Sequence, residues 1–268
     1  MSVINALILG IIQGLTEFLP VSSSAHLGLI PALANWEEQN ISFDIMLHTA
    51  SLLALIVYFR KELKNILLGF FNKENPEFSQ KESKSLILNI FLALIPLVPF
   101  YIFFKSFVES SQSFSNITVI LLMVFGLILI IVDRFKQKNT LTIKGLKIPQ
   151  ALIIGASQCL ALFSGVSRSG ITITSGLLTG LKESDAKKFT FFLSIPTIGA
   201  GFLMALKDVI TGESQLVFSL SLLVAMLATF FSGLLALELL FRFGSKIKLS
   251  YYGIYRIILG IILLIFIF

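Results

Sequence analysis

Apolar stretches alternate with short polar stretches along nearly all of the 268 residues of the chain. A helix needs about 17–25 apolar residues to cross the hydrocarbon layer of a membrane. Six stretches of about that length lie at 43–59, 86–104, 117–132, 189–206, 216–241 and 251–268. Four shorter ones lie at 3–19, 21–33, 149–163 and 170–181. We expect six membrane spans, and two hairpins of half-helices, 3–33 and 149–181, that enter the membrane and return.

The two predicted hairpins carry a repeated segment. Residues 10–25, GIIQGLTEFLPVSSSA, align without a gap with residues 155–170, GASQCLALFSGVSRSG, at an offset of 145. The identical pairs include Gln13 with Gln158 and Ser22 with Ser167. A repeated, polar, turn-containing segment in a very apolar chain is the best indication of where its working site lies.

Composition supports the membrane interpretation. Hydrophobic residues make up 56% of the chain, charged residues only 13%, and the mean hydropathy is +0.91. The core of a soluble domain does not need that much apolar surface. We therefore predict an all-α polytopic membrane protein. Cys159 is the only cysteine, which excludes an internal disulfide and a cysteine metal cluster.

The basic residues indicate how the spans are threaded. The stretches 60–85, 133–148, 182–188 and 242–250 contain six, five, three and three Lys or Arg residues. The remaining loops contain one or none. By the positive-inside rule the basic stretches are cytoplasmic, so the first hairpin enters from outside and the second from the cytoplasm. The net charge of +6 therefore belongs to membrane topology and does not indicate nucleic-acid binding.

This threading makes the chain a single integral membrane domain, 1–268, built from two copies. Residues 3–132 and residues 149–268 each hold one hairpin and three spans. An odd number of spans inverts the second copy relative to the first. An inverted repeat with broken helices places its polar site near the symmetry axis inside the membrane, where the hairpin tips should meet.

The first tip combines a carboxylate with hydroxyls and an imidazole. Its polar residues are Gln13, Glu17, Ser22, Ser23, Ser24 and His26. Gln13 and Glu17 are four residues apart and share one helix face. The serines follow Pro20, so they are placed to cap the second half-helix, with His26 near its first turn. A helix start offers free N–H groups and a positive dipole end, which suit an anion.

The second tip adds a cation. It holds Ser167, Arg168, Ser169 and Thr172, and Arg168 is the only basic residue in either hairpin. An arginine at membrane depth is costly, and its planar fork matches phosphate oxygens. The two tips together predict a site for a phosphate and a divalent cation, Mg²⁺ or Ca²⁺.

Simpler interpretations exist for each polar group. A serine in a membrane helix often only bonds a neighbouring carbonyl, and Glu17 with Arg168 could form a purely structural ion pair. His48, inside an apolar span, is predicted to be a packing residue. Arg256 begins the last span and is expected to snorkel or to pair with a partner that the sequence does not identify.

Two segments resemble the motifs of a known family. QGLTEFLPVSSSAH (13–26) resembles the first motif of the bacterial undecaprenyl-pyrophosphate phosphatases, also called bacitracin-resistance phosphatases, in which Glu or Gln is followed four residues on by Glu. SGVSRSGIT (164–172) resembles the second motif, Pro-Gly-x-Ser-Arg-Ser-x-x-Thr. The resemblance covers essentially the full length. The chain departs from it with Ser164 in place of the proline, and Gln13 is the uncharged option at its position.

The resemblance implies hydrolysis of undecaprenyl pyrophosphate, a polyprenyl diphosphate lipid, to undecaprenyl phosphate and inorganic phosphate. This recycles the lipid carrier for peptidoglycan synthesis and confers bacitracin resistance. The implied catalytic residues are Glu17, Ser23, His26 and Arg168. The implied substrate-binding residues are Ser22, Ser24, Ser167, Ser169 and Thr172. The implied cofactor is Mg²⁺ or Ca²⁺, with Glu17 and Gln13 as its ligands. The location is the bacterial cytoplasmic (inner) membrane, with the site facing outside.

Chemistry assigns roles to this set. Arg168 and the tip amides would hold the diphosphate, Glu17 would bind the metal or orient the nucleophile, and His26 would act as acid or base. Ser23 or a water would attack the terminal phosphorus. The sequence leaves open the nucleophile, the metal, and whether the chain forms a homo-oligomer. A transporter or lipid flippase is the alternative function, because inverted repeats with re-entrant helices are typical of secondary transporters.

Overall fold

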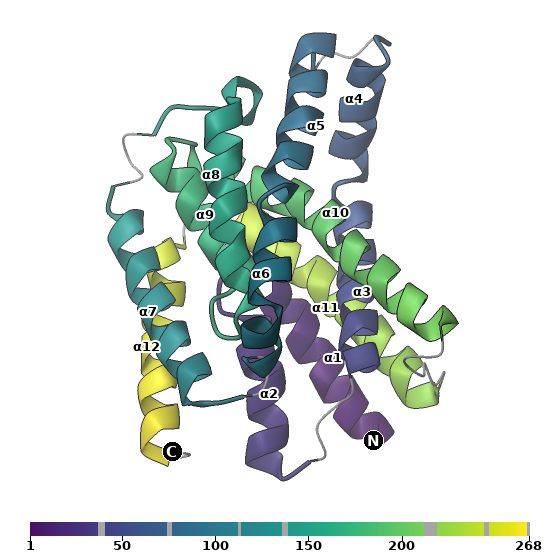
Figure 1. The fold of residues 1–268 in the computed structure, drawn as a ribbon, viewed down its shortest axis with the longest axis vertical. Helices are drawn as coiled ribbons and strands as arrows, with labels where there is room; N and C mark the ends of the chain where they lie inside the picture. The colour runs from purple at the N-terminus through teal and green to yellow at the C-terminus, as the bar shows by residue number, and fades with distance from the viewer. Residues whose placement is uncertain are drawn as a thin grey trace.

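In the computed structural model, the regular structure of the described residues consists almost entirely of helices (Figure 1). The structure describes residues 1–36, 41–73, 77–111, 114–135, 139–211, 219–243 and 247–266. The α-helices are α1 (Val3–Phe18), α2 (Ser23–Ala34), α3 (Ile41–Tyr58), α4 (Arg60–Phe70), α5 (Gln80–Leu94), α6 (Leu97–Ser110), α7 (Asn116–Asp133), α8 (Ile148–Gln158), α9 (Arg168–Leu178), α10 (Glu183–Ile210), α11 (Leu220–Arg242) and α12 (Leu249–Phe266). Two 3₁₀ turns, η2 (Ile143–Gly145) and η3 (Cys159–Leu162), complete the order. Extended pairing within these ranges is confined to an isolated bridge between Leu141 and Leu181.

The long apolar stretches form the spans. Within the described ranges, α7, α10, α11 and α12 are long and apolar enough to cross a membrane, and α5 and α6 together make a fifth span, Gln80–Val108. The helices α3 and α4 make a sixth if the pair, bent by 71°, is taken as one span. The prediction of an all-α, multi-pass membrane protein is confirmed.

Two pairs of short helices form close to the predicted hairpins 3–33 and 149–181, and their entry into a membrane stays a prediction. The helices α1 and α2 make the first, and α8, η3 and α9 make the second. In Figure 1, α1 and α2 extend toward the end of the molecule that carries both termini, and α8 begins toward the opposite end. Ser22 and Ser167, at equivalent positions of the repeated segment, have nearly the same backbone angles, φ 74° and ψ 94° against φ 72° and ψ 109°. This match supports an internal repeat, while the inverted relation of the two complete halves stays a prediction.

Glycines at equivalent positions of the repeat let each hairpin pack closely against a span. A Cβ added at Gly10 would lie 2.3 Å from the carbonyl oxygen of Ala225 in α11, and one at Gly155 would lie 2.1 Å from that of Ala93 in α5. Thr229 Oγ1 also donates to the Gly10 carbonyl at 3.0 Å. Small residues let membrane helices approach until their backbones touch. Each hairpin is therefore packed closely against a span helix.

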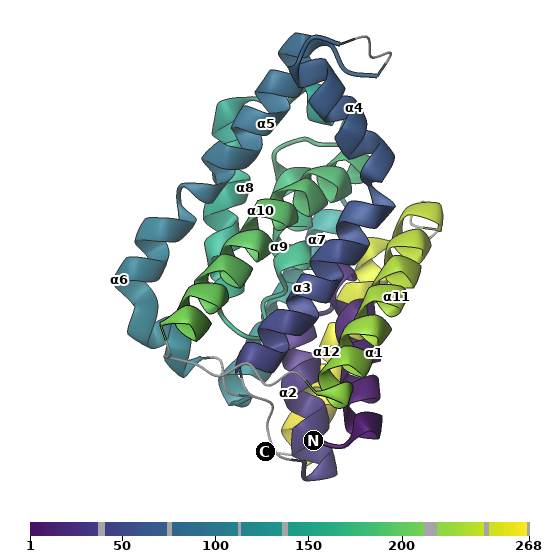
Figure 2. The ribbon, with the colours of Figure 1, turned by 90° about the vertical axis from the view of Figure 1, so that its right-hand side faces the viewer.

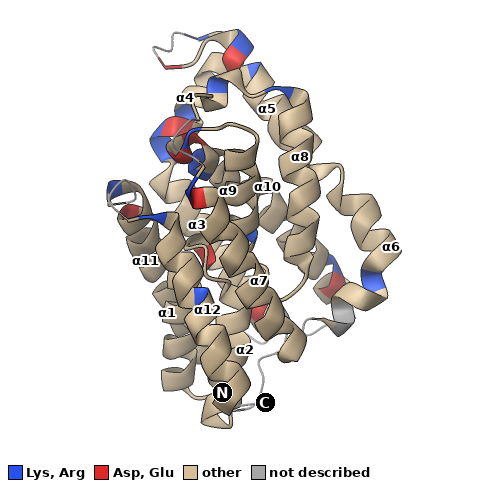
Figure 3. Cartoon of the chain, turned by 90° about the vertical axis from the view of Figure 1, so that its left-hand side faces the viewer, with Lys and Arg blue, Asp and Glu red and all other residues tan. Residues whose placement is uncertain are grey.

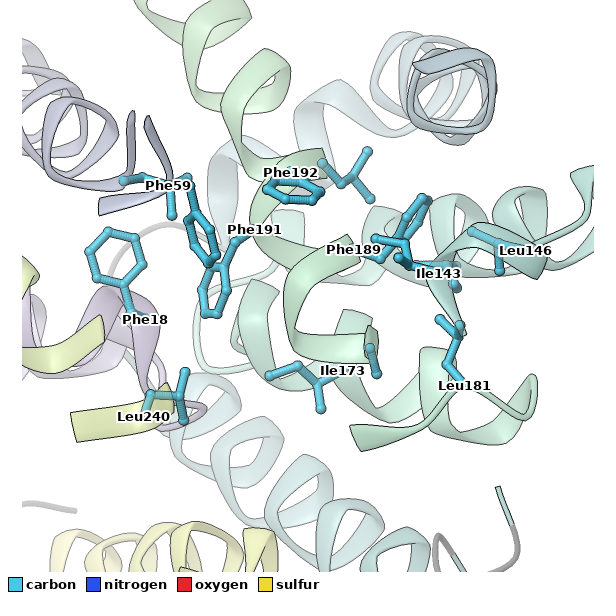
Figure 4. Close-up of a cluster of buried hydrophobic side chains, with 14 of the residues drawn as sticks. Phe18, Phe59, Ile143, Leu146, Ile173, Leu181, Phe189, Phe191, Phe192 and Leu240 are labelled. Carbon is cyan, nitrogen blue, oxygen red and sulfur yellow. The ribbon is translucent and has the colours of Figure 1, made fainter. Parts of the chain in front are cut away.

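A cluster of phenylalanines packs behind the first tip (Figure 4). Phe59, between α3 and α4, lies edge-on to Phe192 and Phe241, with ring centroids 5.3 Å and 5.2 Å apart. Phe18, at the end of α1, lies edge-on to Phe191 at 5.6 Å. Edge-to-face pairs of this kind add to the stability gained from burial. The cluster thus links the end of α1, which leads into the first tip, with the bend between α3 and α4.

Charge is distributed unevenly along the long axis. Many Lys and Arg residues lie along the ribbon at the end that carries α4 and the start of α5 (Figure 3), and both termini lie at the other end (Figures 2 and 3). Between the ends, large apolar side chains face outward, such as Phe103 and Leu203. Many exposed large apolar side chains of this kind suit a lipid environment.

Candidate active site at the hairpin tips

Both tips reverse direction through a serine in an unusual backbone conformation. Ser22 and Ser167 have positive φ values and directly precede α2 and α9. Positive φ is uncommon for residues other than glycine, and such strain persists only where the surroundings fix it, often at functional sites. Ser167 caps α9 by accepting from Gly170 N at 3.1 Å. Ser22 makes no side-chain cap, so the capping predicted for it is wrong.

The tips contact each other although they are far apart in the sequence. Arg168 in α9 forms an ion pair with Glu17 in α1. Ser169 Oγ donates to the Leu19 carbonyl at 3.2 Å, and Gly165 N donates to Ser24 Oγ at 3.4 Å. The structure thus brings together the carboxylate of one hairpin and the guanidinium of the other.

A cavity of about 230 Å³ lies where the tips meet. It is lined by Glu17, Ser22, Ser23, Ser24, His48, Leu97, Gln158, Ala161, Leu162, Ser164, Ser167, Arg168 and Thr197. The predicted residues Glu17, Ser23 and Arg168 are therefore all on its wall. The helices α2 and α9 also begin at these tips, so two positive helix ends lie beside the cavity.

Glu17 is held on both carboxylate oxygens. Oε1 forms an ion pair with the Arg168 guanidinium. Oε2 accepts hydrogen bonds from Ser23 Oγ at 2.8 Å and from Gln13 Nε2 at 3.1 Å. Its side chain is only 4% exposed. These bonds fix the orientation of the carboxylate and place Ser23 directly beside it. Gln13 supports Glu17 from outside the cavity lining, and its role as a metal ligand stays a prediction.

His48 belongs to the site, and its prediction as a packing residue is wrong. Its Nδ1 donates to the Asp44 carbonyl at 2.8 Å, since a carbonyl only accepts, and its Nε2 lies 3.5 Å from Glu17 Oε2. The imidazole lines the cavity with Nε2 toward the carboxylate. The repeat could not reveal it, because its partner is Ser194. The available signal was a histidine four residues after an aspartate in an otherwise apolar span.

His26 is placed differently from the other predicted catalytic residues. Its Nδ1 donates to the Ser22 carbonyl at 2.7 Å, and its Nε2 lies 2.7 Å from the Tyr255 hydroxyl. The two rings are stacked, and His26 does not line the cavity. The geometry therefore makes His26 a support for the Ser22 turn. Its catalytic role stays a prediction that this arrangement does not favour.

The predicted substrate-binding residues divide into two groups. Ser22, Ser24 and Ser167 line the cavity. Ser169 is not part of the lining, and neither is Thr172, whose Oγ1 donates to the Arg168 carbonyl at 2.7 Å. These two hydroxyls hold the tip backbone in place.

Of the two alternatives predicted for Arg256, snorkelling is wrong, whereas pairing is confirmed, with backbone carbonyls as the partners that the sequence does not identify. Arg256 is fully buried in α12, and no part of it snorkels to an interface. Its Nη2 donates to the carbonyls of Gly165 and Val166 at 2.8 Å and 3.0 Å, and its Nε donates to Leu122 at 3.0 Å. Arg256 therefore bridges the second tip to α7 and fixes the loop that presents Arg168.

The donor set limits how a metal could bind. Within the described ranges, no group of three His, Cys, Asp or Glu residues could hold an ion. Glu17 is the one carboxylate on the described cavity wall. Mg²⁺ is commonly bound by one or two carboxylates together with substrate phosphates and waters. The site therefore fits a cation that is shared with a phosphorylated substrate, and it does not form a cage made only of protein.

Comparisons with known proteins point to one family. The family model described as bacitracin resistance protein BacA matches residues 6–262. A relative from Saccharophagus degradans named undecaprenyl-diphosphatase is 38% identical over 97% of this chain and 96% of its own length. Another of that name from Caldicellulosiruptor bescii is 38% identical over 99% and 98%. Undecaprenyl-diphosphatase 1 from Shouchella clausii is 36% identical over 99% and 97%.

Proposed function

The chain belongs to the bacitracin resistance protein BacA family, and we propose that the cavity between its hairpin tips is where it dephosphorylates undecaprenyl diphosphate. Full-length similarity to proteins named undecaprenyl-diphosphatase supports this activity. The products are undecaprenyl phosphate and inorganic phosphate. Bacitracin resistance and a contribution to peptidoglycan synthesis fit the family.

One observation carries the assignment of the site. Glu17 and Arg168 come from different hairpins and face one polar cavity at the starts of two helices. A purely structural ion pair needs no cavity and no ring of serine hydroxyls around it. A diphosphate, in contrast, needs a guanidinium fork, N–H groups from helix starts and hydroxyl donors, and all of these are present.

The chain's own groups account for the hydrolysis. Arg168 and the amides that begin α2 and α9 bind the diphosphate and stabilise the charge that develops on the transferred phosphoryl group. Glu17 orients the nucleophile, which is Ser23 or a water, and accepts its proton. The nucleophile's oxygen bonds to the terminal phosphorus as the bond from that phosphorus to the bridging oxygen breaks, and undecaprenyl phosphate leaves. Attack by water gives inorganic phosphate directly, whereas attack by Ser23 gives a phosphoserine that a water then hydrolyses to inorganic phosphate.

Glu17 with the substrate's phosphate oxygens would hold the divalent cation, Mg²⁺ or Ca²⁺, which when bound supplies Lewis-acid stabilisation of phosphate charge. The supporting observation is the chemistry of the donors, because a carboxylate and hydroxyls are oxygen ligands of the kind that these cations prefer.

The site is proposed to open to the outer face of a bacterial cytoplasmic membrane. The basic end of the molecule would be cytoplasmic by the positive-inside rule (Figure 3). Phe18, which ends α1, and Phe59, which precedes α4, are buried in one apolar cluster. His48 lies in the first half of α3, which begins at the end with the termini (Figure 2). These positions favour access from the end that is poor in basic residues.

Phosphate release tests the proposed function. Purified full-length protein in detergent is expected to release inorganic phosphate from a polyprenyl diphosphate with Mg²⁺ or Ca²⁺ present, and a chelator is expected to abolish the release. Absence of phosphate release with either metal would overturn the proposal. Movement of labelled lipid across vesicles without release would then favour the flippase.

His48 gives a prediction for the proposed mechanism. Replacing His48 with leucine removes the imidazole nitrogen that faces Glu17. The kcat for phosphate release should therefore fall by about tenfold to a hundredfold, no more than the smallest effects of removing a positioned acid–base group. The matched variant Leu53→Ala changes an exposed residue of the same helix. A His48→Leu protein with unchanged kcat would remove His48 from the mechanism.

A further inference from the structure

Gln158 is the residue of the cavity wall whose chemistry the site leaves unexplained. It ends α8, is 2% exposed and lines the cavity. Its Nε2 is buried and has no hydrogen-bond partner within the described protein. A buried amide donor without an acceptor is costly, and such groups in folded proteins usually have a partner, a water or a functional reason.

The oxygen of the Gln158 amide lies beside α10. Gln158 Oε1 lies 3.5 Å from Thr197 Oγ1 of α10, and that hydroxyl donates to the Leu193 carbonyl at 2.8 Å. The contact with Gln158 is therefore the weaker of the two. The hydroxyl has one proton, so it can only share it weakly with Oε1, and Nε2 stays without a partner within the described protein.

The repeat shows what Nε2 lacks. Gln13, the equivalent residue of the first hairpin, donates through Nε2 to Glu17 Oε2, four residues on. The equivalent position in the second hairpin is Leu162, which also lines the cavity. The same amide donor is thus present in both copies, and the second copy has no carboxylate to receive it.

We infer that Gln158 Nε2 binds a diphosphate oxygen of the substrate in place of the missing carboxylate. Gln158, Glu17 and Arg168 line the same cavity, which is where the proposed function puts the diphosphate, so its oxygens are the acceptors available to Nε2 when substrate is bound. Gln158 then acts as a substrate-binding residue on the wall contributed by α8. The inference rests on the proposed function and adds a residue that neither tip motif contains.

The test compares two variants with opposite chemistry, in purified full-length protein assayed with a polyprenyl diphosphate. Gln158→Met keeps the volume and removes the donor, so KM should rise about tenfold, the range for a hydrogen bond to a charged group. Gln158→Glu keeps the shape and adds an anion, so KM should rise further. Inorganic pyrophosphate should inhibit both variants about tenfold more weakly than wild type.

Gln80→Glu, the same exchange at the start of α5, is the matched control and should behave as wild type. If Gln158→Glu does not fold, as judged by gel filtration, the methionine variant decides. Unchanged KM and pyrophosphate inhibition in Gln158→Met would overturn the inference while leaving the proposed function intact. If Gln158→Glu reached half-maximal activity at a lower concentration of Mg²⁺ or Ca²⁺ than wild type, that would also overturn the inference, since the result would assign the amide oxygen to a cation. A wild-type protein that releases no phosphate would instead reject the proposed function itself.

Discussion

Phosphate release by an Arg168→Ala protein is expected to be at least about a hundredfold slower than by wild type, measured as kcat/KM on a polyprenyl diphosphate. Arg168 supplies the one guanidinium on the described cavity wall, and its pairing with Glu17 aims it at the substrate. Removing a preorganised group that meets developing charge in a low-dielectric site costs roughly 3–4 kcal/mol of transition-state stabilisation.

The variant Arg168→Lys refines this prediction. Lysine keeps the charge but cannot make two parallel bonds to a phosphate, so most of the loss should remain. Arg242→Ala removes an exposed arginine that pairs with Glu238 of its own helix and should leave kcat/KM unchanged. If Arg168→Ala retained wild-type kcat/KM, Arg168 would be only the structural partner of Glu17.

Replacing Arg256 is expected to have the second large effect, on stability and activity together. Arg256→Met leaves the carbonyls of Gly165, Val166 and Leu122 without their buried donor. An unsatisfied buried carbonyl costs about 1–3 kcal/mol, so unfolding should occur at a clearly lower temperature. The loop that presents Arg168 loses its anchor, so kcat/KM should fall at least about tenfold.

Cys159 allows the unfolding of the Arg256 variants to be measured directly. Cys159 is the only cysteine, is buried and lies in the second hairpin, so a thiol-reactive fluorophore reports when that region opens. Arg256→Lys should recover little, because one ammonium cannot reach acceptors on two segments in the same geometry. Arg242→Met is the control. An Arg256→Met protein with wild-type unfolding temperature and kcat/KM would show that the tip is held by other contacts.

The spans and hairpins could be predicted because their cause lies in the local sequence. Runs of apolar residues long enough for a membrane appear directly in the sequence, and so do the interruptions at Pro20 and at 164–170. The sequence did not show that the chain bends by 71° between α3 and α4. That bend places Phe59 within a cluster whose other rings come from α1, α10 and α11, so it depends on tertiary packing.

The site was predictable where its residues share a motif and unpredictable where they meet only in space. Glu17, Ser23 and Arg168 lie on the two tips, and the fold brings them together. His48 enters from α3, where Asp44 four residues earlier is the one signal in the sequence, and Arg256 enters from α12 without such a signal. His26 fits the first motif, but Tyr255, 229 residues away, draws its ring out of the cavity lining.

The most direct test of the account is a double-mutant cycle between the two hairpins, with Glu17→Gln and Arg168→Lys measured singly and together as kcat/KM for phosphate release. Two groups that act as one unit give strongly non-additive losses. The kcat/KM of the double variant is predicted to lie within about threefold of the kcat/KM of the less active single variant. Losses that multiply would contradict the claim that Glu17 and Arg168 form one catalytic site.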